Sequence, residues 1–299
     1  MNALSQLIRQ YLLALQFFTR IPVTGRLAAW VGYSPDLLRA SAGHFPGVGV
    51  LVGFLAASVF WLINGLLPQT AFSPFVAAAL STVATVLLTG GFHEDGLADV
   101  ADGLGGSLER ARALEIMKDS RVGAFGAMAL VLSLLVKIGL LAILASVDKA
   151  PNGWMQWIAL TDTSATAGDI GSTVTGYIGW YVSAALLAAH VVSRGLPLAL
   201  IYCLPHVGDT AASKSKPMAD HMSAPSLITG FIWCFCALAL AASVLDASDL
   251  LAACSFALIA MLWMGRLFKR RLQGFTGDCL GATQQVCEIA FYLGLAVSV

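Results

Sequence analysis

The chain reads Gly90-Gly91-Phe92-His93-Glu94-Asp95-Gly96-Leu97-Ala98-Asp99-Val100-Ala101-Asp102-Gly103 directly after an apolar run, residues 72–91, that is long enough to cross a bilayer. This stretch places five ionisable side chains within ten residues. At about 100° per residue, a helix would project Asp95, Asp99 and Asp102 from one face, within about 60° of one another. Three such carboxylates repel one another unless a cation lies between them. The alternative is a solvated helix-capping turn, which the regular spacing and the cost of unpaired carboxylates beside a membrane disfavour.

The cation that suits these carboxylates is Mg²⁺, with Mn²⁺ as the alternative. Hard oxygen ligands favour such ions, and the sequence has no Cys/His quartet of the kind that binds zinc. Magnesium binds through one or two protein carboxylates and completes its shell with water and substrate phosphate oxygens. The acidic stretch therefore predicts a metal site that acts on a phosphate or diphosphate.

The composition indicates an integral membrane protein. The chain is 58% hydrophobic and 11% charged, its mean hydropathy is +0.80, and a soluble domain is about 25% charged. We expect an all-α, polytopic protein that forms one membrane-embedded domain, residues 1–299, with about seven transmembrane helices, six to eight in all. The predicted crossings are residues 46–67, 72–91, 123–147, 177–203, 227–245, 250–268 and 281–299.

Two segments are not predicted to cross. Residues 4–18 form a shorter apolar stretch interrupted by Arg9, which is typical of an amphipathic helix lying at the interface and not of a cleavable signal peptide. Residues 148–176 are rich in Thr, Ser, Gly and Asp around two tryptophans, and we expect a loop with an interfacial aromatic anchor there.

The basic residues orient the chain. Lys and Arg accumulate before the first crossing and after the second, fourth and sixth, whereas the other loops contain only Lys149. The positive-inside rule then places the N-terminus and the acidic stretch in the cytoplasm, and seven crossings place the C-terminus outside. A net charge of zero gives no case for a nucleic-acid partner. The six cysteines lie in or beside apolar segments without metal-binding spacing, so we assign them no chemistry.

Residues 92–122 are predicted to form the main active-site segment on the cytoplasmic side. Gly105 and Gly106 break the first helix, and an amphipathic helix follows. Lys118, Asp119 and Arg121 then precede the third crossing, where a helical hairpin could bring them opposite the aspartates. Asp119 would act as a fourth metal ligand or as a base, and Lys118 and Arg121 would bind phosphate oxygens. The alternative is that these cations only determine topology.

A second polar group lies near the C-terminus. A helix beginning at Asp278 would place Gln285 and Glu288 on the same stripe as Asp278, with glycine leaving room for a ligand. Glu288 would lie inside the seventh crossing, so it needs a partner, for which we propose Arg194 or His190. Packing of buried polar groups without a ligand is an equal alternative.

Two further polar residues and one glycine pair complete the set. His93 is a candidate general base or a supporting partner of the carboxylates, and an ordinary interfacial histidine is the alternative. Lys137 stands alone in an apolar run, where it reaches an interface or pairs with an acid in a neighbouring helix. Gly49 and Gly53 form a small-xxx-small pair that would let two helices approach closely.

These motifs together resemble one enzyme family. In family order, the chain contains Ala14-Leu15-Gln16-Phe17-Phe18-Thr19-Arg20-Ile21-Pro22-Val23, His44-Phe45-Pro46, the 90–103 stretch, Met117-Lys118-Asp119-Ser120-Arg121-Val122-Gly123, Ser193-Arg194-Gly195 and Gly274-Phe275-Thr276-Gly277-Asp278-Cys279-Leu280-Gly281-Ala282. The ordered set is similar to cobalamin-5'-phosphate synthase, also called adenosylcobinamide-GDP ribazoletransferase. The resemblance covers nearly the whole chain and is weak only across residues 148–176 and 204–226.

The resemblance implies a Mg²⁺-dependent last assembly step of cobamide synthesis at the bacterial inner membrane. Adenosylcobinamide-GDP and α-ribazole, or α-ribazole 5'-phosphate, would give adenosylcobalamin or its 5'-phosphate and release GMP. Membrane lipid is a further expected partner, and a homo-oligomer is left open. Family members more often have leucine at the position of Glu94, which would therefore be an additional acid without an assigned role.

The resemblance also implies roles for the residues identified above. Asp95, Asp99 and Asp102 would hold the metal, Asp119 would be a base or a further ligand, and Asp99 and His93 would complete the catalytic group. Lys118 and Arg121 would hold the diphosphate. Arg194 would help to bind substrate, and Asp278, Gln285 and Glu288 would line the acceptor or metal site.

Two rival functions fit parts of the pattern. CDP-alcohol phosphotransferases also place carboxylates on facing membrane helices, but their signature has an acid where this chain has Phe92, so kinship with them is an analogy only. A secondary transporter should have its site at mid-membrane within inverted repeats, and the sequence contains no convincing internal repeat.

Overall fold

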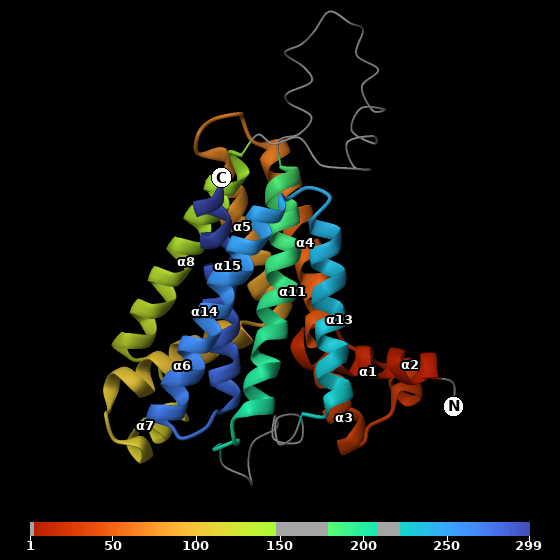
Figure 1. Ribbon diagram of the computed structural model, residues 1–299, viewed down its shortest axis with the longest axis vertical. Coiled ribbons are helices and arrows are strands. Elements are labelled where there is room, and N and C mark those ends of the chain that lie inside the picture. The colour runs from red at the N-terminus through yellow and green to blue at the C-terminus, as the bar shows by residue number, and fades with distance from the viewer. Residues whose placement is uncertain (1–2, 148–178, 209–221) are drawn as a thin grey trace, which may run out of the picture.

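The computed structural model describes residues 3–147, 179–208 and 222–299, in which the regular elements are helices (Figure 1). The predicted all-α class is confirmed. The long helices are α4 (Phe45–Leu66), α5 (Ser73–Thr89), α8 (Ala124–Ala145), α11 (Trp180–Cys203), α13 (Ala224–Ala241), α14 (Ala247–Arg271) and α15 (Gly277–Ser298). The loop predicted at 148–176 lies outside the described residues.

The long helices form a multi-pass bundle. Within the described ranges, six helices are long and apolar enough to cross a membrane, and the number rises to seven if the bent pair of α5 and α6 (Phe92–Gly106) is one span. The predicted second crossing, 72–91, therefore corresponds to α5, which has 17 residues and is short for a span. The other crossings agree with the prediction to within a few residues at most of their ends.

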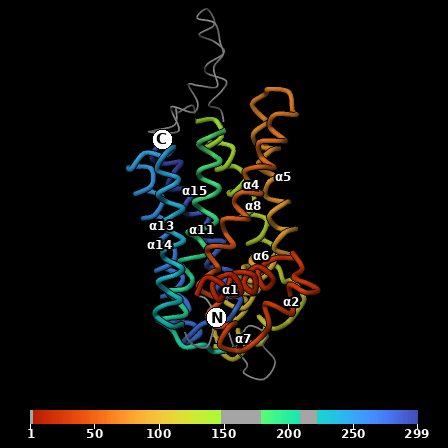
Figure 2. The backbone as a smooth tube through the Cα atoms, turned by 90° about the vertical axis from the view of Figure 1, so that its right-hand side faces the viewer, coloured from red at the N-terminus to blue at the C-terminus, as the bar shows by residue number. Residues whose placement is uncertain are grey.

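The short helices gather at one end of the bundle. They are α1 (Ala3–Phe18), α2 (Gly25–Val31), α3 (Pro35–Ser41), the 3-10 turn η1 (Ala42–His44) and α7 (Arg110–Ile116). In Figures 1 and 2, α1 runs across the bundle near the end where α7 lies, while the C-terminus lies at the opposite end. Helix α1 exposes Leu4 and Leu7 but buries Leu13 and Phe18. Its exposed leucines thus lie near its start and its buried residues near its end.

Two glycines bring α4 and α11 together. A Cβ on Gly49 would overlap the carbonyl oxygen of His190, and a Cβ on Gly53 would lie 2.8 Å from the Cα of Leu187. Only glycine lets the two backbones approach this closely. The predicted small-xxx-small contact is confirmed.

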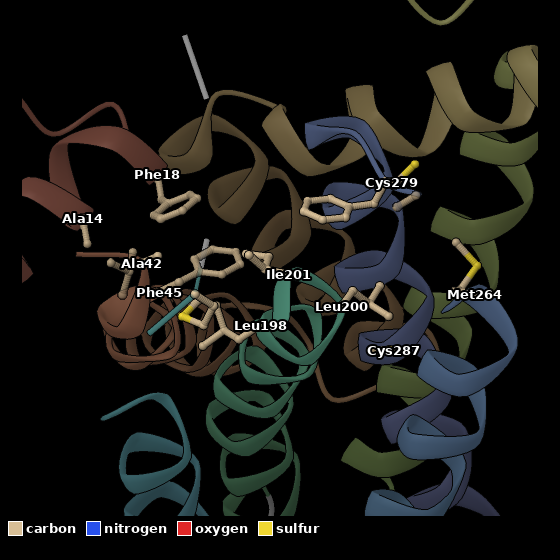
Figure 3. Packing of buried hydrophobic residues seen from close by; sticks show 14 of the residues in the cluster. Ala14, Phe18, Ala42, Phe45, Leu198, Leu200, Ile201, Met264, Cys279 and Cys287 are labelled. Atoms are coloured by element: carbon tan, nitrogen blue, oxygen red, sulfur yellow. The ribbon is translucent and has the colours of Figure 1, made fainter. Parts of the chain in front are cut away.

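Two clusters of buried apolar side chains occupy the two ends of the bundle. The first contains Phe18 and Phe45 (Figure 3), together with the beginning of α15. The second contains Phe60, Tyr181 and Tyr292, from the opposite ends of α4, α11 and α15. Buried polar side chains of α8, α11 and α15 lie between these clusters.

The connection between α5 and α6 positions the acidic stretch. Gly90 and Gly91 both have left-handed backbone angles, with φ of 71° and 70°, which residues with a Cβ rarely adopt. The turn at these two residues puts the axes of α5 and α6 at an angle of 91° to each other. We therefore treat α5 as the crossing segment and α6 as a helix lying at the end of the bundle.

Two arginine side chains tie the end of α6 to the end of α14. The guanidinium of Arg271 donates to the carbonyl oxygens of Leu104 at 3.2 Å and Ser107 at 2.6 Å. Arg110, at the start of α7, donates to the carbonyl of Leu272 at 2.6 Å. These bonds satisfy carbonyls that the end of a helix leaves unpaired, and they place α6 and α7 against α14.

Candidate active site

Glycines set the close contact between α6 and α15. A Cβ on Gly96 would lie 2.7 Å from the carbonyl oxygen of Asp278 and 3.1 Å from its Cα. On the other helix, a Cβ on Gly281 would lie 3.3 Å from the Cα of His93. The acidic stretch and the C-terminal polar group, which are far apart in the sequence, therefore share one helix interface.

This interface gathers three acidic side chains. Asp95 is exposed, and Asp99 and Asp278 are partly buried. Burial is the largest cause that raises the pKa of Asp99, to about 7, and the negative charges of Asp278, Asp95 and Asp102 raise it further. Thr276, the residue at the N-cap of α15, donates to a carboxylate oxygen of Asp278 at 3.3 Å. The resemblance implied that Asp278 lines the acceptor or metal site, and the structure places it across the helix interface from Asp95 and Asp99.

Asp102 has a local partner that the sequence did not indicate. Its Oδ2 accepts from the backbone N–H of Gly123 at 2.7 Å, and its Oδ1 accepts from that of Gly126 at 2.8 Å. Both amides belong to the beginning of α8, whose first N–H groups have no partner within the helix. Asp102 is 8% exposed. Its two oxygens therefore join α6 to α8, and the metal ligation expected of it stays a prediction.

The loop between α7 and α8 holds the other predicted residues. Arg121 donates to both carboxylate oxygens of Asp119, with its Nε 2.9 Å from Oδ1. This interaction lowers the pKa of Asp119 to about 2. Lys118 and Arg121 are exposed. The negative charges that raise the pKa of Asp99 come from Asp278, Asp95 and Asp102, and Asp119 is not among them. Asp119 is paired with Arg121 of its own loop.

The carboxylates of the acidic cluster are chemically suited to a divalent cation. Their positions in the described part of the chain do not form a complete set of metal ligands. Carboxylate oxygens are the ligands that Mg²⁺ takes, and a cation would relieve the repulsion between Asp95, Asp99 and Asp278. Among the residues that the structure describes, no group of three or more His, Cys, Asp or Glu side chains is placed so that it could hold a metal ion. The metal site thus stays a prediction.

A polar cavity opens beside Asp95, and it identifies a residue that the sequence analysis did not assign to the site. The cavity comprises about 1450 Å³ of space, including its open mouth, and lies between the end of α1, the α5–α6 turn and α8. Arg20, Thr19 and Thr89 line it together with Asp95. The guanidinium of Arg20 packs directly over Gly90, where a Cβ would overlap it. An arginine beside an acidic cluster suits a phosphate group bridged by a cation.

A buried polar network lies deeper along α15. Lys137 of α8 contacts Glu288 at 2.6 Å, and His190 of α11 lies 3.4 Å from the same carboxylate. Gln284 donates to Glu288 at 2.7 Å, and Tyr292 donates to it at 3.2 Å. Lys137 and Glu288 are 2% and 1% exposed. The predicted pairing of Lys137 with an acid of a neighbouring helix is confirmed, as is His190 as a partner of Glu288.

This network extends to the acidic stretch. Gln285 donates to Glu94 at 3.0 Å and to Gln284 at 3.0 Å. Arg194 donates to the carbonyl oxygen of His190 at 2.9 Å, and its Nη1 lies 3.0 Å from Nδ1 of the same histidine, which also faces Glu288. The structure therefore gives Glu94 a partner, although the sequence assigned it no role.

His93 faces aromatic side chains. Its ring stacks on Phe45 with the centroids 5.6 Å apart and an angle of 8° between the planes. It is 1% exposed, and in the described part of the chain neither ring nitrogen has a hydrogen-bond partner. His93 thus follows the α5–α6 turn, next to the acidic residues in sequence, with its ring packed among aromatic rings.

Comparisons with known proteins agree on one family. The model of a family described as cobalamin-5-phosphate synthase matches residues 10–296. An adenosylcobinamide-GDP ribazoletransferase of Polaromonas sp. (strain JS666) is 70% identical over 298 residues, covering 100% of both chains. Proteins of the same name from Polaromonas naphthalenivorans and Leptothrix cholodnii are 66% and 43% identical, over 98% of this chain and 99% and 97% of theirs. No solved structure matches the chain.

Proposed function

The chain belongs to the cobalamin-5-phosphate synthase family, and we propose that it catalyses the transfer for which its relatives are named. It would join adenosylcobinamide-GDP to α-ribazole, or to α-ribazole 5'-phosphate, and release GMP. The products would be adenosylcobalamin or its 5'-phosphate. The observation that carries the proposal is the cluster of Asp95, Asp99 and Asp278 beside a cavity that also contains Arg20.

The reaction is a displacement at phosphorus. A ribose hydroxyl of the acceptor forms the new O–P bond with the phosphorus attached to cobinamide, the bond to the GMP oxygen breaks, and the hydroxyl proton passes to a base. Such reactions depend on positioning and on neutralising charge more than on covalent chemistry by the protein. A site that combines carboxylates with cationic side chains suits these needs.

Asp95, Asp99 and Asp278 would hold Mg²⁺, or Mn²⁺ in its place. When bound, the ion would neutralise charge that develops on the diphosphate. Asp102 was predicted as a further ligand, but its bonds to the start of α8 favour a role in placing α6. Its carboxylate would hold the acidic helix in position while the other three face the substrate.

The cationic side chains around the cavity would bind the diphosphate. Arg20 lines the cavity beside Asp95, and Lys118 and Arg121 are on the adjoining loop. If Arg121 turned toward the phosphates, the carboxylate of Asp119 would be released to act as the base or as a ligand. Such an exchange would break the pair that these two side chains form.

The buried network would support this site from deeper in the helix bundle. Glu288, Lys137 and His190 fix α15 against α8 and α11, and Gln285 joins α15 to Glu94 of α6. Arg194 would contribute through His190. The network would thus hold Asp278 and Asp99 opposite each other, whereas the prediction from sequence placed Gln285, Glu288 and Arg194 in contact with substrate.

We further propose that the protein lies in the bacterial inner membrane with this site facing the cytoplasm. The end of the bundle that carries α6 and α7 also carries Arg110, Lys118, Arg271 and their basic neighbours, as the positive-inside rule requires of a cytoplasmic end. Lipid would surround the apolar outer faces of the long helices.

The experiment that tests the function measures GMP release by the purified, detergent-solubilised chain supplied with lipid. The substrates are adenosylcobinamide-GDP and α-ribazole 5'-phosphate, first with Mg²⁺ and then with excess EDTA. We expect GMP in proportion to the joined corrinoid product, and loss of both with EDTA. A folded protein that forms neither product with Mg²⁺ would contradict the proposal and favour a CDP-linked phosphotransferase or a transporter.

A further inference from the structure

The charges of the buried network on α8, α11 and α15 do not balance by themselves. Lys137 and Arg194 are each 2% exposed, and an arginine stays protonated in proteins. Glu288, which is 1% exposed, contacts Lys137 at 2.6 Å. Burial and the neighbouring guanidinium disfavour a charge on His190. In the described part of the chain, the network on these three helices therefore has two cations for one carboxylate.

Glu94 of α6 supplies a second carboxylate. Its charge attracts Arg194, as that of Glu288 does. One of its oxygens, Oε1, accepts from the amide of Gln285 at 3.0 Å. Its other oxygen, Oε2, is buried and has no hydrogen-bond partner among the described residues, and the same is true of Nε of Arg194. Because Glu288 is paired with Lys137, Glu94 is the carboxylate left to balance Arg194.

Arg194 is held in the interior of the bundle. Its Nη1 donates to the carbonyl oxygen of His190 at 2.9 Å, and its guanidinium carbon lies 5.8 Å from the ring centre of Phe45. A buried charge without a counter-charge is costly, because water does not screen it. Loss of the charge of Glu94 would therefore disturb the packing of α6 against the bundle.

Glu94 and the aspartates of the acidic cluster point to different sides of α6. At about 100° per residue, Glu94 lies about 100° from Asp95 and about 140° from Asp99 around the helix axis. Asp95 lines the polar cavity, whereas Glu94 contacts Gln285 of α15. Gly96 lets the two helices approach but has no side chain to stop α6 from turning about its axis. An ionic contact on the inner side of α6 would therefore fix the direction of the carboxylates on the other side.

We propose that Glu94 is a positioning residue of the transferase, which balances the charge of Arg194 and so holds Asp95 and Asp99 toward the polar cavity. This inference rests on the proposed function, because it concerns the carboxylates that would bind the metal. Glu94 acts through the position of α6 and not by contact with substrate. Its partner Arg194 belongs to a helix far away in the sequence, so the sequence alone assigned Glu94 no role.

The alternative is that Glu94 serves only as a hydrogen-bond acceptor for Gln285. The two roles differ in what glutamine at position 94 would do, because its amide oxygen accepts the same hydrogen bond without a negative charge. They also differ in what an exchange of the two side chains would do. An exchange keeps one carboxylate and one amide in contact, and it moves the charge only across one hydrogen bond of 3.0 Å.

The test measures kcat and KM for GMP release by the full-length protein and four variants, with Mg²⁺, adenosylcobinamide-GDP and α-ribazole 5'-phosphate. Glu94→Gln removes the charge, Gln285→Glu adds a second carboxylate, and the exchange variant carries both substitutions. Glu115→Gln is the matched control, because Glu115 is paired with Arg112 on the exposed face of α7.

We expect Glu94→Gln to lower kcat by about tenfold or more and to change KM by less than about twofold, because it displaces catalytic groups without removing any of them. Gln285→Glu should also lower kcat, because two carboxylates in contact repel each other. The exchange variant should recover at least about a third of the unaltered kcat, since it restores the charge balance, and Glu115→Gln should keep the unaltered kcat. An exchange variant no more active than Glu94→Gln would overturn the inference, as would full activity of Glu94→Gln.

The midpoint of thermal unfolding in detergent covers the case in which Glu94→Gln folds poorly. The exchange variant should then recover the midpoint and the yield of folded protein, and failure to recover either would overturn the inference. Adding Arg194→Gln to Glu94→Gln removes the unbalanced charge and should raise the midpoint above that of Glu94→Gln alone. A lower midpoint would show that Arg194 is not the partner of Glu94.

Failure of the proposed function would give a different result. An unaltered protein that is folded and releases no GMP would overturn the transferase and the positioning role together. The order of the unfolding midpoints would still decide whether Glu94 balances the charge of Arg194.

Discussion

Asp99 and Asp102 stand one helical turn apart and have different surroundings. Asp99 faces Asp95 and Asp278, whereas Asp102 is bonded by two backbone amides of α8. The sequence indicates that both carboxylates lie on one face of a helix, because that follows from residue spacing alone. It does not indicate the capping role of Asp102, because the amides of Gly123 and Gly126 are 21 and 24 residues away in the chain and reach it only through folding.

We predict that the carboxylates of Asp95, Asp99 and Asp119 are each required for turnover. Asp95→Asn, Asp99→Asn and Asp119→Asn should each lower kcat for GMP release by more than tenfold, because removing a metal ligand or a base usually costs at least this much. Glu115→Gln is the matched control, since Glu115 is paired with Arg112 on the exposed face of α7.

The amount of each variant in the membrane fraction must match that of the unaltered protein. A variant that keeps more than about a tenth of the activity would show that its carboxylate is neither a metal ligand nor the base. If Asp119→Asn alone kept its activity, its pair with Arg121 would be a structural feature of the loop.

At the scale of the elements, the contact between α6 and α15 decides the geometry of the site. Gly96 and Gly281 allow the two backbones to approach, and Gly90 and Gly91 turn α6 toward α15. The sequence predicts most helix ends to within a few residues, because apolar runs of spanning length are distinctive. The bend of 91° depends on how α6 packs against α15 and α8, which the local sequence does not specify.

We predict that Gly96→Ala lowers stability and activity together. The added Cβ would lie 2.7 Å from the carbonyl oxygen of Asp278, which cannot move without shifting α15, and overpacking of this kind costs about 1–3 kcal/mol. Gly139→Ala is the matched control, because a Cβ at Gly139 meets nothing within 4 Å. Its stability should stay equal or rise, since alanine favours the helix.

The midpoint of thermal unfolding in detergent and kcat for GMP release measure both effects. An unchanged midpoint for Gly96→Ala would mean that α6 and α15 are not in close contact at this position.

At the scale of the whole molecule, the bundle has two unlike ends. The end with α1, α6 and α7 carries the acidic cluster and most of the basic residues, and the opposite end carries the C-terminus (Figure 1). The sequence predicts this polarity from the distribution of Lys and Arg. It does not predict the place of Arg20 in the site, because the polar cavity is built from residues between Gln16 and Leu130 on separate elements.

We predict that the end with the acidic cluster faces the cytoplasm. Alkaline phosphatase fused after Val299 should be active, because this enzyme matures only after export to a compartment that permits disulfides. The same enzyme inserted beside Leu108, which is 88% exposed between α6 and α7, should be inactive. A fluorescent protein at the two positions should give the reverse pattern, and fluorescence at Val299 would contradict the orientation.

The pairing of Lys137 with Glu288 has a consequence for how the chain is made. The ribosome delivers α8 to the membrane long before α15 is synthesised, so Lys137 enters the bilayer while its acidic partner does not yet exist. A lone lysine at the centre of a helix costs about 2.5–3.5 kcal/mol on insertion scales. The nascent chain therefore carries this cost until α15 is made and Glu288 pairs with Lys137.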